Sequence, residues 1–440
     1  MAALDIAIVG PALPAIREHF RVDERSIAWV FNTFVLLNLV GVPLMSKLSD
    51  LFGRRKVYAV DVALFGAGSL LVALAPSFEW LLVGRAFQGF AASGIFPVAS
   101  AVVGDTFAPE KRGRALGVLG AVFGLAFIIG PIVAGILLIF GWQWLFVVNL
   151  PLAGVVFFFS LRLLPDSPEG GAQRLDWRGM GSLCLLLLSL AYGITMLDTE
   201  SLWQSLAQPR IWTAFSISAV MVPVFIAVER RARDPLLRLQ LMNNKQVILA
   251  SLLAAGAGLT EAAFIFFPAL AGTAFEVSKS TASFMLLPLV VAVAVSSPIA
   301  GRILDRVGSR LVITISAGLL TLGMAAVGIG GDQRPFFYTG SVLIGLGLAG
   351  LLGSSLSYIL LNESREAERT ISQGVITLFI SIGQLTGGAF IGAVAASGQG
   401  SKEGYMTAFL VIAGIGLALT LLALQLKSRE AEREAVRAGG

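Results

Sequence analysis

Three charged residues stand inside long apolar stretches of this 440-residue chain: Asp5, Arg85 and Glu261. A carboxylate in a hydrocarbon environment costs several kcal/mol unless it is paired, hydrated or protonated, so an acid kept there is a candidate for function. Such an acid can bind and release a proton or a cation, and a permanently charged guanidinium nearby could expel the proton. Asp5, Arg85 and Glu261 are therefore candidates for the binding and release of a proton or a cation.

Each of these residues also has a simpler interpretation. Asp5 lies close to the start of its apolar stretch and could merely be solvated at a membrane surface. Arg85 stands only a few residues inside its stretch, so its long side chain could reach the polar interface. Glu261 could form a structural hydrogen bond between helices. The positions of these side chains in the folded protein distinguish the alternatives.

The composition identifies lipid as the main solvent of this chain. Hydrophobic residues make up 56% of the sequence and charged residues only 13%, whereas soluble proteins carry about 25% charged residues. Apolar stretches close to twenty residues long are typical of transmembrane helices, because lipid offers backbone groups no hydrogen-bonding partners. The predicted fold class is an all-α polytopic membrane protein. Its fourteen expected spans cover residues 1–16, 27–46, 57–76, 79–104, 115–139, 142–163, 177–198, 210–229, 246–270, 280–300, 310–330, 335–361, 371–397 and 404–426.

The distribution of basic residues orients these spans. With both termini on one side, the loops and the tail on that side hold 24 Lys and Arg residues, and the loops on the other side hold 7. Basic loop residues accumulate on the cytoplasmic side of membranes. We therefore predict a multi-pass cell-membrane protein with both termini cytoplasmic. The excess of Arg over Lys, with abundant Ala and Gly, favours the cytoplasmic (inner) membrane of a bacterium.

The first span is shorter than the others. Sixteen helical residues extend about 24 Å, less than a hydrocarbon core of about 30 Å. Either the bilayer thins around this helix, or further residues precede Met1, and we favour the second explanation.

A short charged loop occurs twice, at residues 46–55 and 301–310, each time at the end of an apolar span. Such a repeat indicates two related halves around a site near the membrane midplane. We predict an N-terminal six-helix bundle over residues 1–164, a linker with two inserted helices over 165–245, and a second six-helix bundle over 246–427. Residues 428–440 are expected to form a cytoplasmic tail, a frayed helix on the surface.

Six motifs in order resemble those of the major facilitator superfamily. The two loops resemble its motif A, and residues 85–89 resemble motif B. Gly117, Gly130, Pro131 and Gly135 on the fifth span resemble motif C, the antiporter motif. Residues 4–14, 142–151 and 175–179 resemble the drug/proton antiporter branch with fourteen transmembrane helices. The resemblance covers essentially the whole chain and implies the major-facilitator fold, which works by alternating access.

The resemblance also implies roles for individual residues. For Asp5 and Arg85 this role is proton coupling, and we add Glu261 to it on physical grounds alone. The motif A loops and the loop after the fourth span would form a gate that biases inward-open against outward-open states. Its residues are Asp50, Gly53, Arg54, Arg55, Asp105, Arg112, Asp305, Arg306 and Arg310. The small residues and the proline of motif C would give close helix packing and a kink, and thereby a proton-tight seal. The simpler alternatives are charge anchoring for the loops and ordinary small-residue packing for motif C.

Aromatic residues near Glu261 suit a hydrophobic cation, because aromatic ring faces attract positive charge. We predict Glu261, Phe264, Phe267 and Gln88 as substrate-binding residues, Gln88 because it belongs to motif B. The alternative for the phenylalanines is packing in a core or against lipid.

Several function classes are excluded or disfavoured. The sequence contains no G-x-x-x-x-G-K-[ST] loop, so the energy source is expected to be an ion gradient rather than ATP. With one histidine and one cysteine, no metal site of these residues is expected, nor any cofactor, and no nucleophile–base pair indicates an enzyme. The net charge of +5 reflects membrane topology rather than a nucleic-acid partner. A monomer in contact with protons, small substrates and the bilayer is expected.

The predicted function is proton-coupled efflux of hydrophobic or cationic drugs, that is, multidrug/proton antiport with drug resistance as its consequence. The alternative is a transporter of one specific metabolite, such as a sugar, an amino acid or a siderophore, and a narrow substrate profile would favour it. A non-transporting sensor on the same fold is a third possibility, favoured by complete absence of substrate-dependent proton movement.

Overall fold

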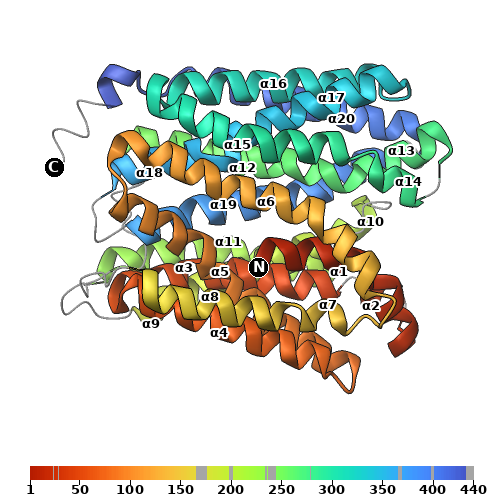
Figure 1. The fold of residues 1–440 in the computed structure, drawn as a ribbon, viewed down its shortest axis with the longest axis horizontal. Coiled ribbons are helices and arrows are strands. Elements are labelled where there is room, and N and C mark those ends of the chain that lie inside the picture. The colour runs from red at the N-terminus through yellow and green to blue at the C-terminus, as the bar shows by residue number, and fades with distance from the viewer. Residues whose placement is uncertain are drawn as a thin grey trace.

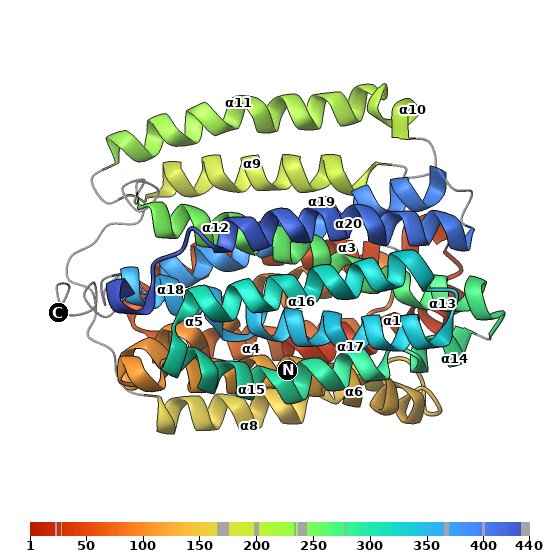
Figure 2. The same ribbon diagram turned by 90° about the horizontal axis from the view of Figure 1, so that it is seen from above.

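The computed structural model is a bundle of long helices that lie nearly parallel to one another (Figures 1 and 2). It describes residues 1–22, 24–27, 29–164, 176–197, 202–232, 235, 244–277, 279–364, 369–397 and 401–432. Within these residues the chain forms helices joined by turns and loops, without a β-strand. The predicted all-α architecture is confirmed.

The helices that precede residue 164 are called the N-half here. Apolar residues of α1, α4, α5 and α7 pack into a common core, with Ile8, Leu81 and Phe146 fully buried. The elements are α1 (Ala2–Phe20), α2 (Glu24–Ile27), α3 (Trp29–Phe52), α4 (Arg54–Ala73), α5 (Phe78–Thr106), α6 (Pro109–Leu137), α7 (Trp144–Val147) and α8 (Asn149–Leu163).

The helices that follow residue 244 are called the C-half. One continuous hydrophobic core, from Leu249 to Leu426, holds it together. The elements are α12 (Lys245–Glu261), η2 (Ala262–Phe266), α13 (Phe267–Phe275), α14 (Lys279–Phe284), α15 (Leu287–Val307), α16 (Ser309–Gly330), α17 (Arg334–Gly350), η3 (Leu351–Ser355), α18 (Leu356–Glu363), α19 (Arg369–Ser397) and α20 (Lys402–Ala423).

Between the halves in sequence come α9 (Trp177–Thr195), α10 (Leu202–Leu206) and α11 (Pro209–Arg231). Figure 2 shows α9 and α11 along one edge of the bundle, with α11 outermost. The apolar face of α9, including Leu183 and Leu187, packs against Leu39 of α3, and Ile382 of α19 joins the same cluster. The helix pair therefore covers one side of the line where the N-half and the C-half meet.

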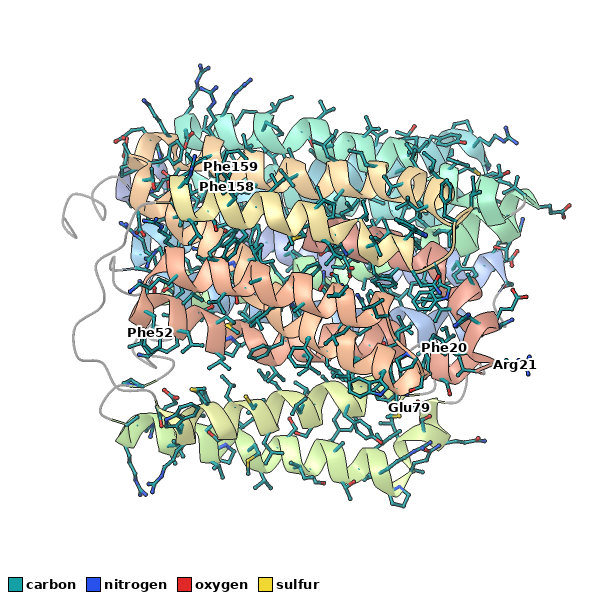
Figure 3. The ribbon with its side chains drawn as sticks, turned by 60° about the horizontal axis from the view of Figure 1, so that its bottom comes forward. Phe20, Arg21, Phe52, Glu79, Phe158 and Phe159 are labelled. Carbon is teal, nitrogen blue, oxygen red and sulfur yellow. The ribbon has the colours of Figure 1, made fainter. Side chains whose placement is uncertain are left out.

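Much of the outer surface is apolar, as expected where lipid is the solvent. Phe158 and Phe159 on α8 are 48% and 51% exposed and point away from the bundle (Figure 3). Among the residues that the structure describes, nine helical stretches are long and apolar enough to cross a membrane. They are Trp29–Phe52, Arg54–Ala73, Phe78–Thr106, Trp144–Leu163, Trp177–Ile194, Pro209–Arg231, Leu287–Val307, Ser309–Gly330 and Lys402–Ala423.

The two ends of the bundle differ in charge. The turns around Gly53 and Gly308 lie at the same end as the junction of α5 and α6, and we call this the basic end. Arg21 and Glu79 lie at the opposite end (Figure 3). The N-terminus lies midway between the two ends in both views (Figures 1 and 2). Asp5, about one turn from it, is therefore near mid-depth rather than at a surface.

Several of the expected continuous spans are interrupted, among them 280–300, where a turn separates α14 from α15. The stretch expected over 246–270 leaves α-helical geometry at Glu261, where α12 gives way to the 3₁₀ segment η2. The stretch expected over 335–361 contains the π-helical segment η3. Hydropathy does not detect such breaks, because both geometries keep the backbone hydrogen-bonded within the segment. Short 3₁₀ and π segments inside helices often mark functional positions.

Candidate functional site

Asp5 lies in the first turn of α1 and is fully buried. Arg85 and Gln88 approach it from one face of α5, because helix residues three apart are neighbours, and Asn149 approaches from the start of α8. Arg85 Nη1 donates to Asp5 Oδ2 at 2.6 Å. Gln88 Nε2 and Asn149 Nδ2 donate to Asp5 Oδ1 at 3.2 and 2.9 Å. Both carboxylate oxygens of Asp5 are therefore engaged inside the N-half.

The Arg85 side chain is fully buried as well. Its Nε donates to the carbonyl of Val30 at 2.9 Å, and Nη1 also donates to Gln88 Oε1 at 2.8 Å. The guanidinium carbon lies 4.5 Å from the ring centre of Phe34 and 5.9 Å from that of Phe146, within the range of cation–π attraction. A buried ion pair is stable only where further contacts satisfy its remaining groups, and these contacts do so for most of the guanidinium.

These positions decide between the alternatives for two of the predicted residues. Asp5 is not solvated at a surface, and Arg85 does not extend to the polar interface. Instead the two charges neutralise each other inside the bundle. The sequence placed both residues in apolar stretches, and the structure brings them together.

Sequence reasoning missed other members of this cluster. Ser69 of α4 accepts a hydrogen bond from Gln88 Nε2 at 2.7 Å and donates to the carbonyl of Phe65 at 2.9 Å. Asn149 could have been found from the sequence, because it is a polar residue within an expected apolar span. Phe34 had none, because it is one of 29 phenylalanines.

Glu261 lies at the last residue of α12, where the helix changes to 3₁₀ geometry. Gln384 of α19 donates from Nε2 to Glu261 Oε2 at 2.9 Å. Glu261 remains partly exposed, whereas Asp5 is fully buried. The acid of the C-half is thus held by a neutral amide and stays accessible, whereas that of the N-half is paired with a cation and enclosed.

The two predicted aromatic partners of Glu261 differ. The Phe264 side chain lies outside the described residues. Phe267 is fully buried in the core of the C-half, with ring centres of Phe409 and Phe337 at 4.8 and 5.6 Å. In this conformation Phe267 is a core residue that a substrate does not reach. Within the described part of the chain, no group of three His, Cys, Asp or Glu residues could hold a metal ion.

The first motif A loop joins the two halves. Asp50, at the end of α3, accepts hydrogen bonds from the backbone N–H of Ile371 at 3.0 Å and of Thr370 at 3.4 Å, in the first turn of α19. A carboxylate at the N-terminus of a helix satisfies free N–H groups and interacts favourably with the helix dipole. Arg54 Nη1 donates to Asp50 Oδ1 at 3.2 Å. We call this contact the Asp50 cap.

Beside it, Asp105 at the end of α5 bridges two arginines from different halves. Its carboxylate pairs with Arg54 Nε at 2.5 Å and with Arg369 Nη1 of α19 at 2.8 Å. Gly53, between α3 and α4, has φ +91°, a conformation that favours glycine. Arg55 is partly buried in the same turn. The predicted gate residues of the first loop therefore lie together, and Arg369 is an addition that sequence reasoning missed.

The second loop makes the reciprocal contact. Asp305 of α15 accepts hydrogen bonds from the backbone N–H of Gly113 at 2.8 Å and of Arg114 at 2.9 Å, in the first turns of α6. Thus an acid of each half accepts backbone N–H groups near the start of a helix of the other half, Asp50 in the first turn of α19 and Asp305 in the second turn of α6. Gly308 has φ +89°, matching Gly53. We call this contact the Asp305 cap.

The remaining gate residues separate into two groups. Arg112 donates from Nη1 to Asn362 Oδ1 of α18 at 3.0 Å and from Nη2 to the carbonyl of Gly104 at 2.8 Å, so it also links the halves. Arg306 and Arg310 are exposed at the basic end, as positive-inside anchoring predicts.

Motif C lies on α6, and only some of its residues are in close contact with another helix. An added Cβ at Gly117 would come 2.6 Å from the carbonyl oxygen of Ser297 on α15, so glycine permits the close approach of the two halves there. At Gly130 it would come 2.5 Å from Cβ of Ala7 on α1. Gly135 has no neighbour within 4 Å of such an atom and is exposed. Pro131 lies within α6, but its side chain is outside the described residues.

Comparisons with known proteins agree with this architecture. The sequence matches the Major Facilitator Superfamily over residues 1–230 and 247–439. It is 33% identical to the "Uncharacterized MFS-type transporter YfiU" of Bacillus subtilis over 392 residues, which are 87% of this chain and 75% of that protein. It is 30% identical to "Multidrug resistance protein Stp" of Mycobacterium tuberculosis, over 90% of this chain and 74% of that protein.

Two further comparisons differ in how much of each protein they cover. "Multidrug resistance protein 3" of Bacillus subtilis is 29% identical over 74% of this chain, but the match spans only 63% of that protein. The crystal structure of the human organic anion transporter MFSD10 (TETRAN) shares the fold with a TM-score of 0.72 over 96% of each chain, at 18% sequence identity. The chain therefore belongs to the Major Facilitator Superfamily and is a multi-pass membrane transporter of that family rather than an enzyme.

Proposed function

We propose that this protein exports hydrophobic, often cationic small molecules in exchange for protons. The observation that carries the proposal is the fully buried ion pair of Asp5 and Arg85 near mid-depth, together with a second, partly exposed acid, Glu261, in the other half. Relatives with 29% and 30% identity that are named multidrug resistance proteins support the substrate class.

In this mechanism the two acids have different tasks. A proton that binds Asp5 removes its charge and breaks the ion pair, and Arg85 is then held by Val30 and Gln88. Glu261 binds the cationic part of the substrate or a proton, but not both at once. Because each acid responds to protonation, proton entry and substrate release can be coupled to the change between the two access states.

We also propose the topology that the resemblance implies. Five further helical segments run alongside the nine apolar stretches: α1, α6, α12–α13, α17–α18 and α19. Counting them gives fourteen spans, with the N-half and the C-half as six-helix bundles and α9 and α11 as the inserted pair. The excess of Lys and Arg supports the basic end as the cytoplasmic end. The Asp50 and Asp305 caps then hold the cytoplasmic side closed in this conformation, and the transporter acts as a monomer.

The test uses purified protein in proteoliposomes that contain a pH-sensitive dye, with an imposed proton gradient. Lipophilic cations such as ethidium are added, and proton flux is followed. The proposal predicts substrate-dependent flux in the wild type and loss of at least about tenfold, the equivalent of 1.4 kcal/mol, in Glu261→Gln. Asp5→Asn should behave in the same way. Glu403→Gln, an exposed acid in the same half, is the matched control and should retain wild-type flux.

Two other outcomes would change the proposed roles of the acids or the proposed substrate class. Undiminished coupling in both Glu261→Gln and Asp5→Asn would contradict the roles of these acids. Proton flux with one class of metabolite and with no lipophilic cation would replace drug export by specific metabolite transport on the same fold.

A further inference from the structure

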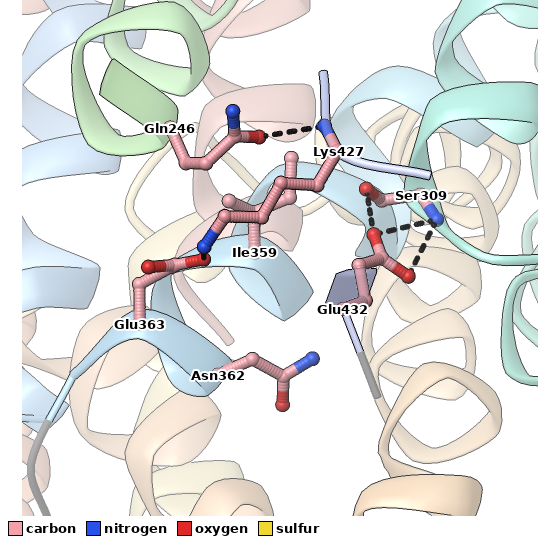
Figure 4. A pocket seen from close by; sticks show the side chains of 7 residues that line it. All are labelled: Gln246, Ser309, Ile359, Asn362, Glu363, Lys427 and Glu432. Atoms are coloured by element: carbon pink, nitrogen blue, oxygen red, sulfur yellow. Dashed lines mark hydrogen bonds and ion pairs between the residues drawn. The ribbon is translucent and has the colours of Figure 1, made fainter. Parts of the chain in front are cut away.

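The chain does not leave the bundle at the end of α20. Residues 424–432, which we call the C-terminal strap, return across the basic end of the C-half (Figure 4). Leu426 is 2% exposed and Glu432 is 9% exposed, whereas the sequence suggested a frayed tail beginning at residue 428. Specific partners are therefore expected for the buried and partly buried residues of the strap, because four others are exposed: Leu424, Gln425, Ser428 and Glu430.

The first part of the strap is fastened to two helices of the C-half. The backbone N–H of Lys427 donates to Gln246 Oε1 of α12 at 3.0 Å. Its ammonium group forms an ion pair with Glu363 of α18, whose other carboxylate oxygen accepts from Asn244 at 2.6 Å. Lys427 thus connects the start of α12 with the end of α18.

The second part reaches the loop between α15 and α16. Arg429 donates from Nη2 to the backbone carbonyl of Asp305 and from Nη1 to the Tyr358 hydroxyl at 3.2 Å. Glu432 accepts from the backbone N–H of Ser309 at 3.1 Å and from the Ser309 hydroxyl. The strap therefore holds both sides of the short turn from Asp305 to Ser309.

Glu432 acts as the missing cap of α16. The residue at the N-cap position of this helix is Gly308, which has no side chain to accept a hydrogen bond. A helix N-terminus leaves free N–H groups that an anionic side chain stabilises. Here the carboxylate comes from a position 123 residues away, so the docked strap stabilises the start of α16.

The same turn carries one of the contacts that join the two halves at the basic end. The carboxylate of Asp305 caps α6 of the N-half, while its backbone carbonyl accepts from Arg429 of the strap. Asn362, on the wall of the pocket between strap and α18, accepts from Arg112 of the N-half. The strap thus lies directly behind two contacts between the halves.

We propose that the C-terminal strap positions the Asp305 cap and thereby stabilises closure of the basic end, and that docking of the strap depends on pH at that end. Arg429 and Glu432 are the positioning residues. The physiological consequence rests on the proposed function, because it requires that protons enter through this protein.

The sign of the pH dependence follows from the surroundings of Glu432. Burial raises the pKa of this carboxyl above its usual value, and Glu363 adds to the effect, whereas the bonds from Ser309 and the charge of Arg429 oppose it. The docked strap thus binds a proton more tightly than the free strap does, and the protonated carboxyl still has a carbonyl oxygen that can accept from the Ser309 N–H. Docking is therefore strongest at low pH and weakens as pH rises through the docked-state pKa. If the basic end is cytoplasmic, protons that enter through the protein lower the local pH there and favour docking of the strap. The closed state is then stabilised, and transport slows.

The first experiment is hydrogen–deuterium exchange of the full-length protein in lipid nanodiscs, corrected for the intrinsic effect of pH. In the wild type, protection of the strap and of the start of α16 should decline from mildly acidic to mildly alkaline pH. Glu432→Gln keeps an acceptor for Ser309 and cannot ionise, so its protection should change less with pH than that of the wild type; the carboxyl of Asp305 in the same turn still titrates in the variant. Glu430→Gln, an exposed neighbour, should follow the wild type.

The second experiment measures closure without reference to proton flux. Ser46 is fully buried on α3, facing Gly374 of α19 across the contact between the halves. Ser46→Cys in a Cys184→Ser background therefore reports opening of the basic end by its reaction with a water-soluble maleimide. Arg429→Ala should raise the labelling rate several-fold, and Glu430→Ala should leave it unchanged.

The outcomes separate this proposal from the proposed function. Unchanged labelling in Arg429→Ala would overturn the positioning role of the strap. Equal pH dependence in wild type and Glu432→Gln would overturn the pH response. Increased labelling in Arg429→Ala with no drug-dependent proton flux in the wild type would uphold the strap and reject drug/proton antiport.

Discussion

Asp5 and Arg85 are 80 positions apart in the sequence and form an ion pair of 2.6 Å in which both side chains are fully buried. Neither charge has access to solvent in this conformation, so each depends on the other. Removing either charge therefore affects the packed interior of the N-half rather than a local surface.

The ion pair leads to a first prediction. Asp5→Asn leaves the Arg85 charge buried without a counter-charge, and breaking a buried pair in this way costs about 3–5 kcal/mol. Arg85→Gln likewise leaves the Asp5 carboxylate buried without a counter-charge. The double variant Asp5→Asn with Arg85→Gln removes both charges and should be more stable than the sum of the single effects predicts. Thermal unfolding of purified variants measures this, and simple additivity would show that the two charges are not coupled.

A second prediction concerns the Asp50 cap. Asp50→Ala removes the carboxylate that accepts from Thr370 and Ile371 at the start of α19. The lost capping interaction is worth about 1 kcal/mol, enough to shift the population toward opening of the basic end roughly fivefold. Maleimide labelling of Ser46→Cys in the Cys184→Ser background should rise accordingly. Asp332→Ala removes an acid that pairs with Lys402 away from this contact and should not change the labelling; an equal rise there would refute the assignment.

The glycines of α6 give a third prediction with an internal control. Gly117→Ala places a methyl group 2.6 Å from the Ser297 carbonyl oxygen, and such overpacking typically costs about 1–3 kcal/mol. The halves should therefore separate more readily, and transport should be impaired. Gly135→Ala meets nothing within 4 Å and should be neutral or stabilise the helix by up to about 1 kcal/mol. Equal effects of the two substitutions on thermal stability would contradict this view of the contact.

A fourth prediction concerns a buried acid outside the proposed mechanism. Asp61 of α4 is fully buried, and neither carboxylate oxygen has a hydrogen-bond partner among the described residues. Gly94 of α5 lies directly opposite, and an added Cβ there would collide with Asp61 Oδ2. Gly94→Ala should therefore lower stability by about 1–3 kcal/mol. Asp61→Ala removes the obstacle, so the double variant should regain most of the loss, whereas a double variant as unstable as Gly94→Ala alone would rule out this contact as the cause.

The sequence alone determined the class and the outline of the fold. Apolar runs of about twenty residues can only be helices when lipid surrounds them, and most of the expected spans coincide with observed helices. The exceptions are informative: the breaks after Glu261 and within 351–355 leave hydropathy unchanged, and only Pro268, in the first turn of α13, was a sequence signal for the first of them. The repeated loops also indicated correctly that two segments far apart in sequence occupy equivalent positions, with Gly53 and Gly308 both at positive φ.

The sequence also located the charged residues that need an explanation, because a charge in an apolar run is visible in one dimension. Only the tertiary structure decided their partners. Asp5 meets Arg85 and Asn149, Glu261 meets Gln384, and Glu432 caps α16, across sequence separations of 80 to 144 positions. Such pairings depend on the rotation and depth of neighbouring helices. Helix packing sets these quantities, and no local property of the sequence records them.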